Sequence, residues 1–286
     1  MQPCSSDEPI NVNVDEIRNI VSVSIRRTSA FLRFGLDELN TRDGGNFNLA
    51  AGVNYQFWPE VITTDERNDA RDAYRSWLVG CGLRELDQYY SIFLDKVWWA
   101  IEVGEKHGTA LPAGFKFDAK FAELTNVAEK QKRVTKKLGS HNFSEELKSL
   151  SKARNCLAHN TGMVRSPNDC NNAALDTLEI KWLAFDMLAI RGGKERIIDK
   201  LPFDTNELPG EGDTKVAVRF GQRVLAFPAG TRVNLTLSQI AEFCVFYNNM
   251  AEKTIEGLLN FFLSKGLIAS VGDPTAAEPE QTPGPM

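Results

Sequence analysis

The stretch Leu83–Val103, LRELDQYYSIFLDKVWWAIEV, decides the fold class. Its apolar side chains recur at spacings of three and four residues, which place them on one face of an α-helix. A helix with such a face must bury it against other elements. The stretch therefore predicts a long core-facing helix in a mainly α-helical fold. The residues of this face are Leu86, Tyr90, Phe93, Leu94, Val97 and Ile101.

Further helices are predicted on both sides of this stretch from apolar spacing and from capping residues. Thr64 is expected to cap a helix that Gly80 and Gly82 interrupt before Leu83. Ser144 is expected to cap a later helix that reaches the stretch Arg154–Asn160. The remaining predicted helices are about Val14–Leu39, about Asp118–Lys137 with a stop at Gly139, and a final helix that opens with the Thr236–Gln239 capping box and ends near Lys265 and Gly266.

A small β segment is predicted between the last two long helices. Leu178–Trp182 alternates with a period of two, which is typical of a strand. Val216–Phe220 and Val224–Phe227 flank Gly221-Gln222, which predicts a hairpin at that dipeptide. Residues 163–175 and 191–214 are expected to be loops. The predicted fold is a mainly α bundle with a small β insertion before the last long helix.

The expected domain organisation follows from these patterns. Residues 1–12 form a flexible N-terminus, and 13–267 form a single helical domain that includes the β insert at about 163–235. Residues 268–286 form a Pro-rich tail that we expect to be disordered, since four of the twelve prolines fall there.

The charge of the chain is unevenly distributed. The 286 residues carry a net charge of −5, which argues against a generally basic nucleic-acid binder. The segment 130–165, however, holds nine basic and two acidic residues, or +7. The remaining 24 basic and 36 acidic residues give −12. The composition therefore permits a local anion site.

Targeting and cysteine patterns favour a cytoplasmic protein. No apolar run approaches the length of about 18 residues that spans a membrane, and no secretory signal is visible. The five cysteines are widely spaced and odd in number, which is untypical of a disulfide framework. Arg191–Lys194 is glycine-rich but is not a phosphate-binding P-loop, so no cofactor is predicted.

The segment with the most chemical information is Ser151–Gly162, SKARNCLAHNTG. It holds Arg154, Asn155 and His159 within six residues. A guanidinium suits a phosphate because its planar fork donates two hydrogen bonds, and an imidazole can exchange protons near neutral pH. Arg154 and His159 lie five positions apart, about 140° around an ideal helix. They converge on one ligand only if the helix end distorts or if the arginine reaches around.

The pattern R-N-x-x-x-H at the end of a helix resembles the HEPN superfamily, on Arg154, Asn155 and His159. This resemblance implies a helical bundle that forms a homodimer and brings two motifs together at a shared cleft. It also implies a metal-independent endoribonuclease, which uses the 2′-hydroxyl of RNA as the nucleophile and leaves a 2′,3′-cyclic phosphate. Such proteins often act in toxin–antitoxin or phage-defence systems, so a protein antitoxin or regulator is a further candidate partner. The β insert lies outside the minimal bundle.

In this interpretation Arg154 binds and stabilises the scissile phosphate. His159 is the general acid or base, or it orients the phosphate, and Asn155 positions the other groups or the RNA. Candidate RNA contacts, drawn from the basic segment, are Lys132, Arg133, Lys136, Lys137, Lys152 and His141.

Other interpretations remain open at this point. Arg154 and His159 can serve only as cations at a helix C-terminus, and the lysines 130–137 can be a solvated face. The chain can also be a non-catalytic module that binds RNA, a nucleotide or a protein, or a structural dimer. Cys156 with His159 is a weak candidate for a nucleophilic pair, and the cysteines and histidines lack zinc-ligand spacing. Glu85 and Asp87 can reach the site from an earlier helix, but we expect them to be ordinary surface acids.

Overall fold

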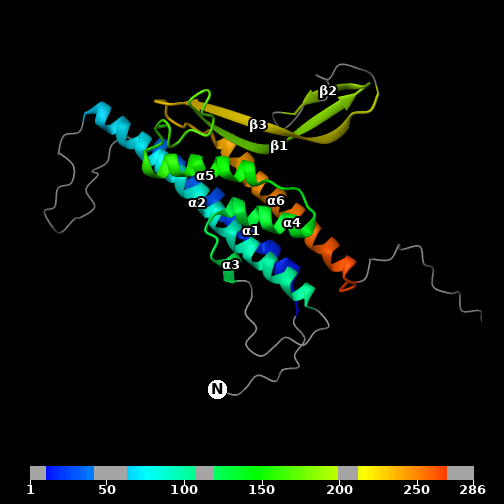
Figure 1. Ribbon diagram of the computed structural model, residues 1–286. Helices are drawn as coiled ribbons and strands as arrows, with labels where there is room; N and C mark the ends of the chain where they lie inside the picture. Colours follow the sequence, from blue (N-terminus) through cyan, green and yellow to red (C-terminus); the bar gives the residue numbers. More distant parts are fainter. Residues whose placement is uncertain (1–10, 42–62, 107–118, 199–211, 269–286) are drawn as a thin grey trace, which may run out of the picture.

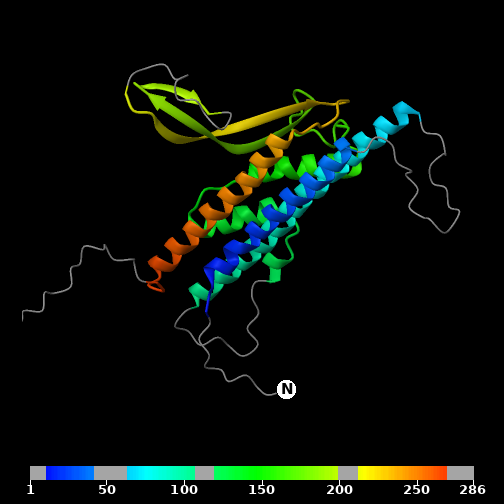
Figure 2. The ribbon, with the colours of Figure 1, turned by 180° about the vertical axis from the view of Figure 1, so that it is seen from behind.

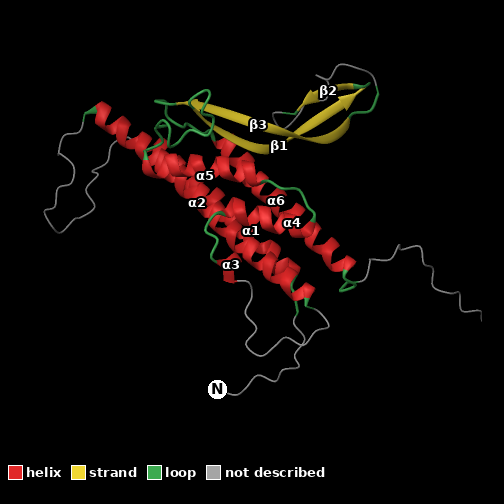
Figure 3. Ribbon diagram, in the orientation of Figure 1, coloured by secondary structure: helices red, strands yellow, loops and turns green. Residues whose placement is uncertain are grey.

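The computed structural model describes residues 11–41, 63–106, 119–198 and 212–268. Within them the chain is mainly helical, and a three-stranded antiparallel sheet precedes the last long helix, which confirms the predicted class (Figures 1 and 3). The two termini expected to be flexible lie almost entirely outside these residues. The helices are α1 (Val14–Thr41), α2 (Thr64–Glu105), α3 (Ala119–Ala122), α4 (Val127–Leu138), α5 (Ser144–His159) and α6 (Leu237–Ser264), and the strands are β1 (Thr177–Arg191), β2 (Lys194–Ile197) and β3 (Lys215–Pro228).

Helix α2 is continuous over 42 residues, so the expected interruption at Gly80 and Gly82 is wrong. Both glycines are points of close approach. A Cβ on Gly80 would lie 3.2 Å from the Cβ of Leu157, and a Cβ on Gly82 would lie 2.8 Å from the side chain of Leu32. The glycines therefore let α5 and α1 pack closely against α2 and do not break it.

Two of the predicted helix starts shift by one residue. Thr63, not Thr64, caps α2 and shares a reciprocal capping box with its third residue. Phe143 occupies the cap position of α5, and the side chain of Asn142 accepts the hydrogen bond from the backbone N–H of Ser144 at 3.1 Å. Both corrections reflect side-chain acceptors that lie one or two residues before the expected ones.

The helix predicted over about Asp118–Lys137 is divided into α3 and α4. The side chain of Asn126 accepts from two backbone N–H groups at the start of α4, which begins a new helix at that point. Gly139 ends α4 in the left-handed conformation, with φ of 64°, as predicted. The capping box Thr236–Gln239 at the start of α6 is also confirmed.

The predicted hairpin at Gly221-Gln222 is wrong. β3 runs straight through this dipeptide, and Gly221 lies opposite Ala184 in the long antiparallel pair of β1 and β3. The tight turn instead joins β1 to β2 at Gly192-Gly193, where φ is 54° and 75°. A two-residue hairpin turn of this kind needs positive φ at both central positions, and consecutive glycines supply it. β2 therefore lies within the expected loop 191–214.

The helices and the first half of β1 bury their apolar side chains in one hydrophobic cluster. Figures 1 and 2 show the sheet on one side of the bundle, against α5 and the start of α6. Trp182 of β1 is buried and donates its indole N–H to Glu242 of α6 at 2.8 Å. None of the described helices combines the length and apolar character needed to cross a membrane.

Candidate functional site

Helix α5 carries the whole Arg–Asn–His segment and remains helical through its last residue, His159. Directly after it, the N–H groups of Asn160 and Gly162 both donate to the carbonyl of Cys156. Gly162 has φ of 81°, so the chain can turn sharply there. The distortion of the helix end that would bring Arg154 and His159 together is absent from this part of the structure.

The guanidinium of Arg154 is paired with a buried carboxylate. Its Nη1 donates to Oδ2 of Asp87 on α2 at 2.7 Å, and the hydroxyl of Ser151 donates to the same oxygen at 3.2 Å. The hydroxyl of Tyr247 on α6 donates to the other oxygen of Asp87. Asp87 is only 4% exposed, whereas the side chain of Arg154 is 29% exposed. Three helices therefore fix this arginine at the edge of the core.

Burial dominates the electrostatics of this cluster. It raises the pKa of Asp87, although the Tyr247 hydrogen bond, the charge of Arg154 and the Ser151 hydrogen bond all act to lower it. Burial, together with the negative charge of Asp87, also raises the pKa of Tyr247 well above its ordinary value. The tyrosine therefore remains a hydrogen-bond donor at physiological pH.

Asn155 completes the orientation of Arg154. Its side-chain oxygen accepts from Nε at 3.2 Å and from Nη2 at 3.0 Å of the neighbouring arginine. Arg154, Asn155, Asp87 and Ser151 line a cavity of about 610 Å³ between α2, α5 and the segment 125–127, which we call the Arg154 cavity. A guanidinium has five N–H donors, and three of them are bonded to Asp87 and Asn155, so two have no partner within the described residues.

His159 lies apart from this cavity. Its imidazole is exposed, makes no hydrogen bond or ion pair within the described residues, and is not among the residues that line the Arg154 cavity. It belongs to a different face of α5, where Lys148, Lys152, Asn155 and His159 follow one another at spacings of four, three and four residues. We call these four residues the outer stripe.

A second cavity adjoins the first along the outer stripe. It has a volume of about 410 Å³ and shares Asn126, Ser151 and Asn155 with the Arg154 cavity. We call it the lysine cavity, because its lining includes Lys148, Lys152 and Lys181.

The other candidate RNA contacts are dispersed. Lys132, Arg133, Lys136 and Lys137 are exposed on α4, and none of them lines either cavity. Lys137 forms an ion pair with Glu105 at 2.7 Å.

Two more residues of the basic segment differ in their settings. Lys130 is buried and bonded to Asp95 at 2.6 Å, so it belongs to the core and not to a solvated face. His141 is exposed and its ring contacts that of Phe143, with 4.5 Å between centroids. Of the six candidate RNA contacts, Lys152 alone reaches the cavities beside Arg154.

The expectation that Asp87 is a surface acid is wrong. A signal was present in the sequence, because Asp87 lies four residues after Leu83 and three before Tyr90, on the apolar face of the helix. Glu85, in contrast, is paired with Arg27 of α1 at 2.6 Å. Tyr247 was missed because it lies within an equally apolar face of α6, where a tyrosine is expected as a core residue.

Cys156 has the properties of a core residue. It is fully buried, and burial raises the pKa of its thiol to about 12. A thiol with such a pKa is not ionised at neutral pH and is a poor nucleophile. The described residues contain no group of three or more histidine, cysteine, aspartate or glutamate side chains arranged to hold a metal ion.

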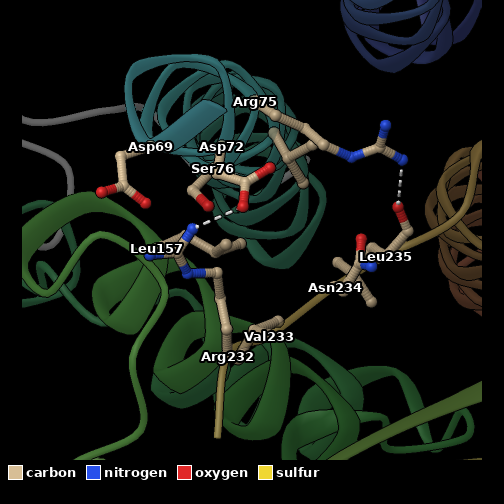
Figure 4. A pocket seen from close by; sticks show the side chains of 10 residues that line it. Asp69, Asp72, Arg75, Ser76, Leu157, Arg232, Val233, Asn234 and Leu235 are labelled. Carbon is tan, nitrogen blue, oxygen red and sulfur yellow. Dashed lines mark hydrogen bonds and ion pairs between the residues drawn. The ribbon is translucent and has the colours of Figure 1, made fainter. Parts of the chain in front are cut away.

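A further cavity of about 590 Å³ lies between α2 and the segment 232–235 (Figure 4). Its two arginines already have partners within the chain. Arg232 is paired with Asp72 at 3.0 Å, and Arg75 donates to the carbonyl of Leu235 at 3.2 Å. This cavity contains neither Arg154 nor His159.

Comparisons with protein-family models, with curated protein sequences and with solved structures gave no match to this chain.

Proposed function

We propose that this protein is a metal-independent endoribonuclease of the HEPN type, which acts as a homodimer. The observation that carries the proposal is the setting of Arg154. Its guanidinium is oriented by Asp87 and Asn155, yet it keeps free donors beside an open cavity of about 610 Å³. Preoriented donors of this kind stabilise charge that develops in a transition state.

The three residues of the motif have separate roles in this proposal. Arg154 binds the scissile phosphate and stabilises its added negative charge, while Asn155 holds the fork of the arginine in place. His159 moves a proton as general acid or base, since imidazoles exchange protons near neutral pH. The 2′-hydroxyl attacks the phosphorus, the bond to the 5′-oxygen breaks, and that oxygen takes up a proton. The products are a 2′,3′-cyclic phosphate and a 5′-hydroxyl end.

In this proposal a second copy of the chain brings a His159 close to Arg154. Within one chain Arg154 lines the cavity and His159 lies on the outer stripe, about 140° away around the helix. We therefore propose that Arg154 of one copy works with His159 of the other at a cleft between two α5 helices.

Cleavage of a labelled single-stranded RNA in excess chelator tests the proposal. We expect wild type to cut and to leave cyclic phosphate ends, and His159→Ala to lose about 10²–10⁴-fold in rate. Arg154→Ala leaves Asp87 buried without its partner, so Arg154→Lys is the matched variant that keeps the charge and loses the fork. Equal cleavage by wild type, His159→Ala and Arg154→Lys would reject this assignment.

The biological setting is part of the same proposal. A toxic or defensive ribonuclease slows the growth of cells that express it, and a protein antitoxin or regulator would restrain it. We expect wild type to inhibit growth and His159→Ala to be tolerated at equal protein level. If cells tolerate both wild type and His159→Ala, the protein is not a toxin. The cleavage assay described above then decides separately whether it cuts RNA.

A second candidate is a non-catalytic RNA- or nucleotide-binding module. It is favoured by one observation: three of the five N–H groups of Arg154 are already bonded within the chain. RNA binding without cleavage, unaffected by His159→Ala, would support this alternative.

A further inference from the structure

The lysine cavity combines a positive lining with a fixed framework. Three lysines face one glutamate, Glu145, among its lining residues. Lys148 and Lys152 come from α5, whereas Lys181 comes from β1. The cavity therefore exists only because the β insert packs against α5.

The two walls of this cavity are joined by hydrogen bonds. The hydroxyl of Ser149 on α5 accepts from the N–H of Lys181 at 2.8 Å and lies 3.2 Å from its carbonyl. The ammonium of Lys152 donates to the carbonyls of Asn168 at 3.1 Å and Cys170 at 2.9 Å. An ammonium has three donors, so Lys152 is held in place and keeps one donor for a ligand.

The local field in the cavity is positive. Lys148 is paired with Glu145 at 2.8 Å, and Lys181 with Glu179 at 2.9 Å, but both lysine side chains remain about two-fifths exposed, at 44% and 39%. The Lys148 hydrogen bond holds the pKa of Glu145 below its ordinary value, and the charge of Lys181 acts in the same direction. The Lys148–Glu145 pair is exposed on both sides and therefore weak, so a phosphate can displace Glu145 from Lys148.

The lysine cavity adjoins the Arg154 cavity. Asn126, Ser151 and Asn155 line both. Lys148 and Asn155 lie seven positions apart, which is about 10 Å along the axis of α5. An extended polynucleotide can therefore place one phosphate at Arg154 and a second phosphate of the same strand among the lysines.

We infer that the lysine cavity is a phosphate subsite for the RNA strand, and that the strand leaves Arg154 along α5 toward β1. This inference rests on the proposed function, because it takes Arg154 as the position of the scissile phosphate. It assigns RNA binding to Lys148 and Lys181, which belong to the cavity, and not to the exposed basic face of α4. The β insert thereby forms one wall of the substrate path.

Equilibrium binding to a fluorescent single-stranded RNA with 2′-O-methyl groups tests this path, since such an RNA cannot be cut by 2′-hydroxyl attack. We expect Lys148→Gln/Lys181→Gln to weaken binding at least tenfold at 0.1 M salt and to reduce the salt slope by about 1.4. The matched control is Arg133→Gln/Lys136→Gln, which removes the same charge from exposed positions of α4. We expect it to change binding less than threefold. An equal or larger effect of the control pair would overturn the inference.

The outcome separates this inference from the proposed function. If wild type cleaves RNA and the cavity pair binds and cleaves as wild type does, the path is wrong and the ribonuclease stands. The single variants Lys148→Gln and Lys181→Gln serve if the double variant does not fold, and each is expected to weaken binding about threefold. If either single variant binds the RNA as tightly as wild type does, the path is also rejected.

A length series distinguishes a strand from a free phosphate. We expect affinity for wild type to rise from a dinucleotide to a hexanucleotide, and this rise to be lost in Lys148→Gln/Lys181→Gln. Inorganic phosphate that competes as well as a hexanucleotide would show that the cavity takes a free anion and would overturn the strand path.

Discussion

The inner and outer faces of α5 hold the motif side chains Arg154 and His159 in opposite ways. On the inner side Arg154 is bonded to Asp87, which Tyr247 holds from a third helix. On the outer side His159 is exposed and has no partner within the described residues. Arg154 is fixed by the core, and His159 is available to solvent, to a ligand or to a second copy of the chain.

This difference means that Arg154 is oriented before a ligand binds, whereas His159 is free to meet one. A side chain bonded to the core loses its mobility when the protein folds, so binding a phosphate costs it less. A side chain exposed to solvent can exchange protons but must be positioned by something else. The two faces therefore predict different outcomes for activity and for the free energy of unfolding.

The largest expected effect is on catalysis by the outer face. His159→Ala should lower the rate of RNA cleavage about 10³-fold, because the general acid or base is lost. It should leave the free energy of unfolding within about 0.5 kcal/mol, since exposed residues without partners contribute little. Denaturant titration beside the cleavage assay measures both. If His159→Ala lowered the free energy of unfolding as much as Arg154→Ala does, the two faces of α5 would not differ in the way described.

The next effect concerns the stability of the inner face. Arg154→Ala should lower the free energy of unfolding by about 3 kcal/mol at pH 7, because it leaves a buried carboxylate without its ion partner. Asp87→Asn should cost less, about 1 kcal/mol, since the guanidinium that remains is partly exposed to water. Urea unfolding of both variants gives the comparison. A larger loss for Asp87→Asn would show that the carboxylate is not the costly partner.

A smaller effect is expected from the tyrosine that supports the aspartate. Tyr247→Phe removes a hydrogen bond to a charged group and should cost about 2 kcal/mol. Tyr90→Phe is the matched control, because Tyr90 is equally buried and donates to the neutral side chain of Gln131 at 2.8 Å. It should cost about 1 kcal/mol. Equal losses of unfolding free energy in the two variants would mean that Tyr247 does not donate to a charged carboxylate.

The smallest effect is a difference in pH dependence. Burial raises the pKa of Asp87, so the folded chain binds that proton more tightly than the unfolded chain. Its contribution to stability is full below the unfolded pKa, about 3.9, and is lost as pH rises through the folded pKa. The stability of wild type relative to Asp87→Asn should therefore fall as pH rises through this window and then stay constant.

Glu66 provides a control of opposite sign for this pH experiment. Backbone and side-chain hydrogen bonds of Thr63 lower its pKa. Its contribution is therefore present above the unfolded pKa and is lost as pH falls through the folded pKa. Relative to Glu66→Gln, wild type should gain stability as pH rises over the acid range. If the stability of wild type relative to Asp87→Asn also rose with pH, as it should relative to Glu66→Gln, the effect of burial on the pKa of Asp87 would be contradicted.

Local signals predicted the helical elements well. The apolar spacing of Leu83–Val103 and the Thr236–Gln239 capping box each lie within one element, and both are confirmed. Glycines were harder to interpret, since the same residue can break a helix, turn a strand or admit a neighbour. Gly80 accommodates Leu157, and Gly192 turns a hairpin, and only the packing partners distinguish these roles.

The candidate site was predictable in its composition but not in its arrangement. The Arg–Asn–His segment and the angle between Arg154 and His159 follow from the sequence and the helical period. The pairing of Arg154 with Asp87 joins residues 67 positions apart, and the hydrogen bond from Tyr247 to Asp87 joins residues 160 positions apart. Such contacts depend on how three helices pack, which no local pattern contains.

Mixing two inactive variants tests the central claim that both faces of α5 act in one site shared by two copies. Arg154→Lys and His159→Ala, each inactive alone, are unfolded together and refolded as a mixture. A mixed dimer holds one intact pair, with Arg154 from one chain and His159 from the other. The account predicts that about a quarter of wild-type RNA cleavage returns, since mixed dimers form about half of the population and each has one of two sites. Cleavage no greater than that of the separate variants, in a sample where mixed dimers have formed, would contradict it.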